Sequence, residues 1–487
     1  MSQRVCVIGI DCAPPELVFG EFRSVMPNVD RLIRSGIHGP LQSTIPPITV
    51  PAWMCMMTGK DPGTLGIYGF RNRKDHSYDA LEFANSRMVR EEAVWDILGR
   101  QGKRSTLIGV PLTYPPKPIN GLLVGDFLTP STDADYTFPS DLKDEIRSVV
   151  GDYVVDVRNF RTTERDRVLA DLRHMAEQRF RLARHLATSH PWDFLMLVEM
   201  GTDRLHHAFW RFHDPRHPQH EPQSRYRNTI RDYYVELDGY IGDFLDALPD
   251  DTTVMLVSDH GAGPMDGGIC LNEWLMQEGY LALKQPVTAM TKFSTSLVDW
   301  SRTRAWGDGG YYGRLFINVE GREPQGTVPA DQADALLAEL TARLEALGDQ
   351  QGNPIGTRVM RPRDVYRAVN GVAPDLIVYF GNLRWRSVGS LGHGTVWTHE
   401  NDIGPDDANH SETGIAVIAR LDAPPRNSEP RPMSIYDIAP TILSEFGVQP
   451  PAGMVGSSVV SSQEAAPGYT PEEEAEIARR LEDLGYL

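Results

Sequence analysis

An aspartate and a histidine stand side by side where a predicted core strand stops. The run "TTVMLV" (252–257) is apolar and rich in β-branched residues, which predicts a buried strand. Asp259 and His260 follow it, and two glycines lie just beyond. A carboxylate and an imidazole are costly to bury unless something pairs with them. Their place at a strand end indicates a site.

Two further candidate ligands share one face of a predicted helix. The stretch "DFLMLVEMG" (193–201) predicts a buried strand, and a helix is expected directly after it. Asp203 and His207 are four residues apart, a spacing that puts both side chains on one helical face. His206, three residues after Asp203, is the alternative partner.

Polar groups end or precede other elements of the same predicted sheet. Asp11 follows the first predicted strand, and His410 lies in a loop just before a late strand (412–420). Thr49, in "PPITVPAW", precedes a helix expected to begin near Ala52. Sites in open α/β sheets gather at the carboxyl ends of the strands, so these groups are expected to meet.

Three aspartates and three histidines form an N/O ligand set that suits Zn²⁺, with Mn²⁺ as the second choice. Six ligands exceed the needs of one tetrahedral site, so two metal ions are expected. Paired metals stabilise the attacking and the leaving oxygen of a phosphoryl displacement. Each residue could also have a purely structural role, in a helix cap, in a turn or in a salt bridge on a helix face. Their gathering at the ends of one sheet favours the metal hypothesis.

The composition of the chain limits the classes of partner that the protein is expected to bind. The 487 residues carry a formal net charge of −18, which argues against a nucleic-acid partner, because such binding needs a basic face. No run approaches the length of a membrane span, so no membrane association is expected. The four cysteines show no C-x-x-C spacing, which indicates a reducing, cytoplasmic setting.

Strands alternate with helices along most of the chain, which predicts an α/β fold with a doubly wound, mostly parallel sheet. Residues 1–275 are expected to form the first part of the catalytic core, and 401–462 its final part. The less regular stretch 276–400 is interpreted as an inserted cap or substrate region. Residues 463–487 predict a helical tail with one apolar stripe. That stripe could cover its own core or a second copy, so a homo-oligomer stays open.

The chain that carries these residues resembles the alkaline phosphatase superfamily. The likeness is to its type I phosphodiesterase/nucleotide pyrophosphatase branch, including bacterial phosphohydrolase/phosphomutase-like proteins. It covers nearly the whole chain and rests on these stretches: "VIGIDCAPPELV", "MPNVDRLIRSGIHGPLQSTIPPITVPAW", "TGKDPGTLGIYGF", "DWSRTRAW", "INVEGREPQG" and "NDIGPDDANH". The resemblance implies a sheet of alkaline-phosphatase type with an inserted cap.

By position, the resemblance implies one metal held by Asp11, Thr49, Asp259 and His260, and another held by Asp203, His207 and His410. Thr49 would be the nucleophile. Cys12 departs from the pattern where a glycine is usual, and Leu65 where a histidine is common. The run "TVPAW" lacks the C/S-x-P-x-R of sulfatases, which argues against that branch.

The expected function is a metal-dependent phosphoester hydrolase with a phospho-threonine intermediate. A phosphodiesterase/nucleotide pyrophosphatase on a small phosphorylated metabolite or nucleotide is favoured. The alternatives are a phosphomonoesterase or phosphomutase using the same two-metal site, and a non-catalytic metal-binding protein. Asn72, Arg304 and Arg322 are the candidate substrate-binding residues.

Overall fold

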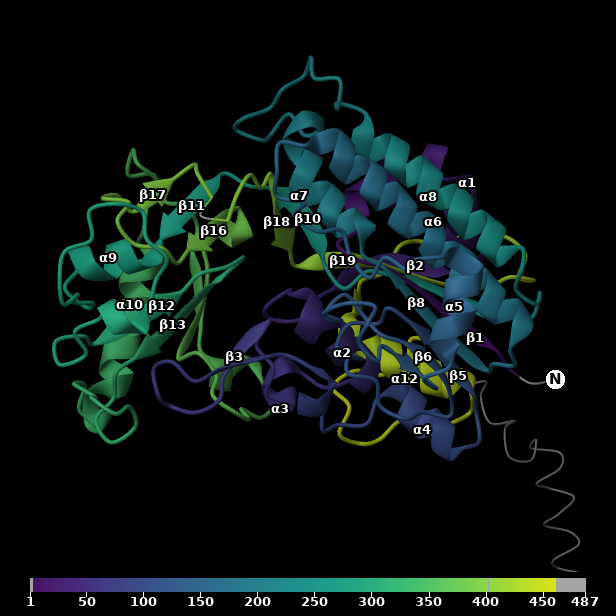
Figure 1. The fold of residues 1–487 in the computed structure, drawn as a ribbon, viewed down its shortest axis with the longest axis horizontal. Helices are drawn as coiled ribbons and strands as arrows, with labels where there is room; N and C mark the ends of the chain where they lie inside the picture. The colour runs from purple at the N-terminus through teal and green to yellow at the C-terminus, as the bar shows by residue number, and fades with distance from the viewer. Residues whose placement is uncertain (1–2, 402, 461–487) are drawn as a thin grey trace, which may run out of the picture.

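The computed structural model describes residues 3–401 and 403–460. The predicted helical tail, 463–487, lies outside the described residues. The chain forms two lobes, and Figure 1 shows the second, drawn in green, beside the larger sheet-containing core. The first and last described parts of the chain both belong to that core.

A nine-stranded sheet organises the core. Its strands are, in spatial order, β20 (Met433–Ser434), β2 (Ile37–Gln42), β19 (Thr413–Arg420), β9 (Thr253–Val257), β1 (Val5–Ile10), β8 (Phe194–Glu199), β5 (Ser105–Ile108), β6 (Gly121–Val124) and β7 (Thr137–Phe138). β1 pairs in parallel with β8 and β9. Only β19 and β7 run against their neighbours. The predicted doubly wound, mostly parallel sheet is confirmed.

Helices cover both faces of this sheet (Figure 1). One layer contains α1 (Pro27–Ser35), α5 (Leu142–Val150), α6 (Arg165–Ser189), α7 (Gly201–His213) and α8 (Thr229–Leu245). The other contains α2 (Thr49–Thr58), α4 (Val94–Arg100) and α12 (Ile438–Glu445). Burial on both faces explains why β1, "VCVIGI", is apolar throughout instead of alternating.

The second lobe has a hydrophobic core of its own, built from residues between Ile269 and Val396. Its elements are β11 (Gly267–Cys270), α9 (Leu271–Gln277), β12 (Ala305–Asp308), β13 (Gly313–Ile317), α10 (Ala333–Glu345), β14 (Arg358–Met360), α11 (Pro362–Val365), β15 (Leu376–Tyr379), β16 (Trp385–Val388) and β17 (Trp397–Thr398). Trp300 and Trp306 are buried in this core, and Tyr78 stacks on Trp300 with ring centres 3.6 Å apart.

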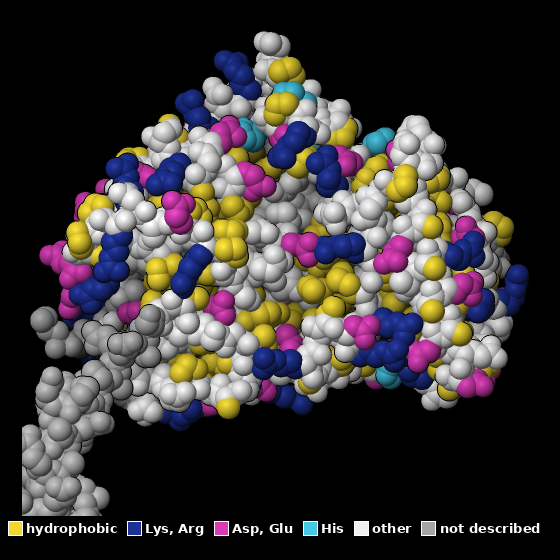
Figure 2. All heavy atoms as spheres, turned by 180° about the vertical axis from the view of Figure 1, so that it is seen from behind, with side chains coloured by type: hydrophobic (Ala, Val, Ile, Leu, Met, Phe, Trp, Pro, Cys, Tyr) yellow, Lys and Arg dark blue, Asp and Glu magenta, His cyan; other side chains and the backbone are white. Residues whose placement is uncertain are grey.

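Smaller elements connect the lobes. The hairpin of β3 (Arg71–Arg73) and β4 (Leu81–Phe83) follows α3 (Pro62–Leu65), and β10 (Gly261–Pro264) pairs antiparallel with β18 (Ala408–Ser411). On the face shown in Figure 2, acidic and basic side chains are interspersed. Among the described residues, none of the helices combines the length and apolarity needed to cross a membrane.

Candidate functional site

The structure brings the predicted ligands together at the carboxyl edge of the sheet. Asp11 follows β1, Asp259 and His260 follow β9, Asp203 and His207 lie on α7, and His410 lies on β18. Candidate ligand atoms of Asp11, Asp259 and His260 all lie within 4.8 Å of one another, and so do those of Asp203, His260 and His410. All six side chains are buried.

The ligands form two adjacent groups. In the first group, His260 Nε2 is 3.7 Å from Asp11 Oδ1 and 3.2 Å from Asp259 Oδ2. In the second group, Nε2 of His207 and Nε2 of His410 are each 3.4 Å from Asp203 Oδ1. The rings of His260 and His410 stack with centres 3.9 Å apart, so the two groups touch.

Each ligand carboxylate is held through only one of its oxygens. Trp53 Nε1 donates to Asp11 Oδ2 at 2.7 Å, and the Cys12 backbone N–H donates to Asp259 Oδ1 at 3.3 Å. Arg204 Nη1 donates to Asp203 Oδ2. The second oxygen of each carboxylate faces the centre of the cluster.

Each imidazole is oriented in the same way, with Nδ1 turned outward to an acceptor. His207 Nδ1 lies 2.6 Å from Asp406 Oδ1, His410 Nδ1 lies 2.9 Å from the Pro47 carbonyl oxygen, and His260 Nδ1 lies 3.1 Å from the Gly261 carbonyl oxygen. In a neutral imidazole, an Nδ1–H that donates outward leaves Nε2 as an unprotonated acceptor facing the cluster. Burial opposes the charge of His207, but Asp406, Tyr311 and Asp203 hold the pKa of that imidazole well above its usual range, so a metal that binds its Nε2 displaces a proton.

Five of these inward atoms are buried and have no hydrogen-bond partner among the described residues. They are Asp11 Oδ1, Asp203 Oδ1, Asp259 Oδ2, His207 Nε2 and His410 Nε2. Buried polar atoms are normally paired, so a convergent set of unpaired acceptors requires explanation. Acceptor atoms alone cannot pair with one another, whereas a divalent cation satisfies them together. The residues therefore fit bound metal ions.

The electrostatics of the cluster agree with that fit. Burial raises the pKa of Asp11 well above its usual range, and Asp203 raises it further. Burial likewise raises the pKa of Asp259, with Asp11 adding to the shift. Burial opposes the charge of Asp203 too, but His207 and Arg204 hold the pKa of that carboxyl well below its usual range. Three neighbouring carboxyl groups need positive charge to ionise together.

Thr49 lies against the first group. It is the first residue of α2, which begins three residues earlier than the expected start near Ala52. Its Oγ1 is 3.2 Å from His260 Nε2, and the residue is 2% exposed. The first-turn N–H groups of a helix have no acceptor within it, and Pro51 supplies none. The helix therefore offers the N–H groups of Thr49 and Val50 beside the hydroxyl.

The sequence does not predict most of the residues that orient the candidate metal ligands. Trp53 lies one helical turn after Thr49, and Asp406 lies four residues before His410, but neither spacing predicts a contact. Arg204 also forms two hydrogen bonds with Asp156, through Nε at 3.1 Å and Nη2 at 2.8 Å. Nothing in the sequence links that loop aspartate to the cluster.

The structure separates the two adjacent histidines. His207 faces Asp203, whereas His206 Nε2 lies 3.3 Å from Tyr234 Oη on α8. Burial lowers the pKa of His206 to about 3.

The two positions that depart from the family pattern are both buried. Cys12 adopts a φ of 65°, a left-handed conformation that glycine tolerates best, and Leu65 lies in α3.

In the part of the chain that the structure describes, the three candidate substrate-binding residues contact other groups and not the ligand cluster. Asn72 braces a turn, accepting from the Tyr68 N–H and donating to the Gly69 carbonyl. Arg304 lies exposed on the second lobe, with Cζ 5.6 Å from the centre of the Tyr280 ring. Arg322 is paired with Glu323 and Asp375.

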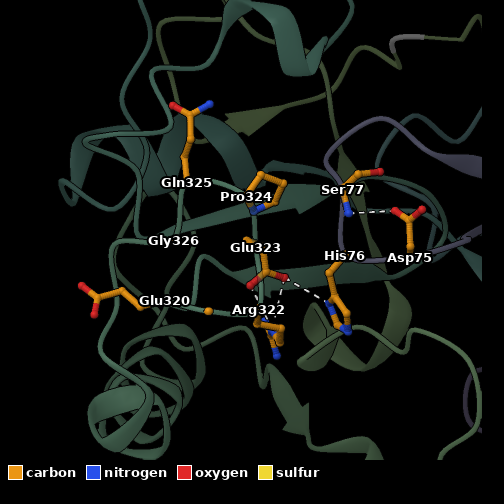
Figure 3. A pocket seen from close by; sticks show the side chains of 10 residues that line it. Asp75, His76, Ser77, Glu320, Arg322, Glu323, Pro324, Gln325 and Gly326 are labelled. Atoms are coloured by element: carbon orange, nitrogen blue, oxygen red, sulfur yellow. Dashed lines mark hydrogen bonds and ion pairs between the residues drawn. The ribbon is translucent and has the colours of Figure 1, made fainter.

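Arg322 lines the hollow drawn in Figure 3, which has a volume of about 660 Å³. Two loops form it, residues 75–77 and residues 320–326. Glu323 lies at its centre and meets His76, whose Nδ1 is 3.3 Å from Glu323 Oε1. None of the residues that line it belongs to the cluster of candidate ligands or is Thr49, so the size of this hollow does not identify the site.

Comparisons with known proteins identify a family and a shared fold. Residues 5–405 match the family model for type I phosphodiesterase / nucleotide pyrophosphatase. Among solved structures, an inactive form of murine ectonucleotide pyrophosphatase/phosphodiesterase 5 in complex with AMP superposes with a TM-score of 0.55 at 13% identity. That alignment covers 92% of this chain and 96% of the murine chain, and it shows a shared fold. No curated protein sequence gives a match.

Proposed function

The chain belongs to the type I phosphodiesterase / nucleotide pyrophosphatase family, and we propose that it cleaves phosphoric diesters or pyrophosphates through a phospho-threonine formed on Thr49. The substrate is a small phosphorylated metabolite or nucleotide. The ligand set suits two divalent metal ions, Zn²⁺ first and Mn²⁺ second.

One observation carries the proposal: the five buried, unpartnered acceptor atoms that converge beside the Thr49 hydroxyl. Asp11, Asp259 and His260 would hold one cation next to Thr49. Asp203, His207 and His410 would hold the other. When bound, the two cations would lower the pKa of the attacking hydroxyl and neutralise charge on the phosphoryl oxygens.

The residues of the chain supply attack and orientation. Thr49 Oγ1 forms a bond to phosphorus, its proton passes to solvent, and the bond from phosphorus to the leaving oxygen breaks. The N–H groups at the start of α2 donate to the phosphoryl oxygens. Water then attacks the phospho-threonine, which returns the threonine hydroxyl and releases the product. Two inversions give net retention at phosphorus.

Turnover of paired chromogenic substrates tests the proposal. Bis(p-nitrophenyl) phosphate and p-nitrophenyl phosphate are compared by kcat/KM on one metal-loaded preparation, after elemental analysis of its metal content. We expect close to two metal ions per chain and a preference for the diester. A fully active preparation without transition metal contradicts the proposal. A clear preference for the monoester contradicts only the diesterase part of the proposal, and the metal-dependent mechanism through Thr49 still stands.

The enclosure of the site favours a second candidate, a phosphomutase. Thr49 is 2% exposed, and a phospho-enzyme shielded from water can return its phosphoryl group to a bound acceptor. Turnover in ¹⁸O-labelled water distinguishes the two reactions. A hydrolase incorporates one labelled oxygen into the phosphoryl product, whereas a mutase incorporates none.

A further inference from the structure

A tyrosine of the second lobe covers the second ligand group. Tyr311, between β12 and β13, stacks on His410 with ring centres 4.0 Å apart and on His207 with ring centres 5.1 Å apart. Asn409 Nδ2 donates to the Tyr311 backbone carbonyl at 3.0 Å. The tyrosine is only half-buried, so it forms a partly open wall beside these two imidazoles.

Arg161 lies at the edge of that wall. Its Nη2 donates to Tyr311 Oη, and its Nε donates to Asp406 Oδ2 at 2.8 Å. Its Cζ is 4.4 Å from the centre of the Phe160 ring and 5.8 Å from that of Tyr311. The side chain is 17% exposed. Its guanidinium hydrogen bonds to the described residues are made by Nε and Nη2, not by Nη1. A fixed guanidinium therefore keeps one donor edge available.

Five arginines and four aspartates form a network of ion pairs on this side of the site. Within the described ranges, arginines form ion pairs with Asp156, Asp203, Asp406 and Asp407; they are Arg161, Arg165, Arg204, Arg211 and Arg386. The chain as a whole is strongly acidic, with a net charge of −18. The four aspartates offset all but one of these five positive charges, and the one in excess beside this ligand group, in such a chain, favours an anionic ligand there.

This charge lies on the leaving-group side of the proposed reaction. Thr49 approaches phosphorus from the group that contains Asp11 and Asp259. Displacement is in line, so the leaving oxygen departs away from Thr49, toward the group that contains Asp203. Arg161 and Tyr311 border that second group.

We propose that Arg161 and Tyr311 bind a second phosphoryl group carried by the leaving group, and so select pyrophosphate substrates over simple diesters. The inference rests on the proposed function of the same site. A planar guanidinium suits a phosphate better than a point charge does, because it donates along two parallel hydrogen bonds. Tyr311 Oη, held by Arg161, supplies a further hydrogen bond.

Two substrates that share the retained group test the selection. In dTTP, Thr49 Oγ1 attacks the α-phosphorus, the α–β bridging bond breaks, and pyrophosphate leaves; water then releases TMP. In the p-nitrophenyl ester of TMP, the same attack expels p-nitrophenolate, which carries no phosphoryl group. The change in the ratio of the two kcat/KM values between the wild type and a variant therefore reports the contacts made to the leaving group.

We expect Arg161→Gln to lower kcat/KM for dTTP by about 10- to 100-fold, the loss typical of a hydrogen bond to a charged group. The ester should change far less, and Arg161→Lys should recover part of the loss. Tyr311→Phe should act in the same direction, more weakly. Inorganic pyrophosphate, tested as an inhibitor of ester hydrolysis, should bind more weakly to Arg161→Gln. Arg173→Gln, an exposed arginine on α6, is the matched control.

Metal content is measured in every variant, because Arg161 also contacts Asp406. An equal loss on both substrates overturns the inference, whether or not metal is lost with it. So does wild-type protein that cleaves the ester but not dTTP, and that result leaves the proposed function standing. Wild-type protein that cleaves neither substrate removes the proposed function itself.

Discussion

His207 Nδ1 lies 2.6 Å from Asp406 Oδ1, with the Ala408 carbonyl oxygen 3.1 Å from the same nitrogen. Asp406 Oδ2 accepts from Arg161 at 2.8 Å and from Arg386 at 3.3 Å. The carboxylate is thus fixed on one side by guanidinium groups and orients the imidazole on the other. It keeps the His207 proton on Nδ1 and leaves Nε2 free for a ligand.

Asp406→Asn is expected to weaken the second metal by about 10- to 100-fold, because partners that orient a ligand histidine contribute that much to affinity. The first metal, near Thr49, should bind as before. Metal titration of the purified apoprotein measures both sites. Asp422→Asn, an exposed aspartate paired with Arg420, is the control and should change neither. Unaltered binding of the second metal by Asp406→Asn contradicts the role assigned to this carboxylate.

Thr49→Ala should keep both metals and lose turnover by about a thousandfold or more, as expected when a nucleophile is removed. Thr49→Ser keeps a hydroxyl at the start of α2 and should retain part of the rate. Mass spectrometry of quenched reactions with dTTP should find a peptide containing Thr49 that carries the retained thymidylyl group in the active protein and none in Thr49→Ala. The same group on another residue would identify a different nucleophile.

The two adjacent histidines of α7 should respond differently to alanine. His207→Ala removes a candidate ligand atom, Nε2, that has no hydrogen-bond partner within residues 3–401 and 403–460, so the second metal and the activity should both be lost. His206→Ala removes a contact with Tyr234 and leaves the cluster complete. It should therefore lower the midpoint of thermal unfolding and leave the metal content of the protein unchanged. A greater loss of metal from His206→Ala would reverse the assignment.

Metal binding should strengthen as pH rises. The pKa values of Asp11 and Asp259 are raised by burial, so protons occupy these carboxyls at higher pH than they would an exposed aspartate. Metal binds the deprotonated form, so acidification from about pH 8 to about pH 6 should weaken it and binding should release protons. Calorimetry in buffers of different ionisation enthalpy measures that release. An affinity independent of pH, with no proton release, would exclude this linkage.

Local patterns in the sequence were enough to predict the sheet and its ends. A continuous apolar run such as "VCVIGI" is stable in the interior of a sheet that is covered on both faces. The carboxyl ends of such strands lie at one edge, so Asp11 and Asp259 could be placed near each other before the pairing of β1 with β9 was known. The spacing of Asp203 and His207 could be interpreted in the same way, from helix geometry.

The antiparallel direction of β19 (Thr413–Arg420) could not be predicted from its apolar pattern. β19, "TGIAVIAR", is as apolar as the parallel strands, yet it runs antiparallel between β2 and β9. Hydrophobicity reports burial, and burial is the same for either direction. The connection through the second lobe decides where β19 enters the sheet.

The sequence by itself determined which side chains could bind metal, because ligand chemistry belongs to residue type and each ligand follows or lies on a predictable element. Only the tertiary structure decided which atoms face inward. Asp406, Trp53 and Arg204 each contact a ligand and fix which of its atoms remains free. Tyr311 reaches His410 from a separate lobe. These contacts join residues whose separation in the chain carries no periodicity, so packing alone establishes them.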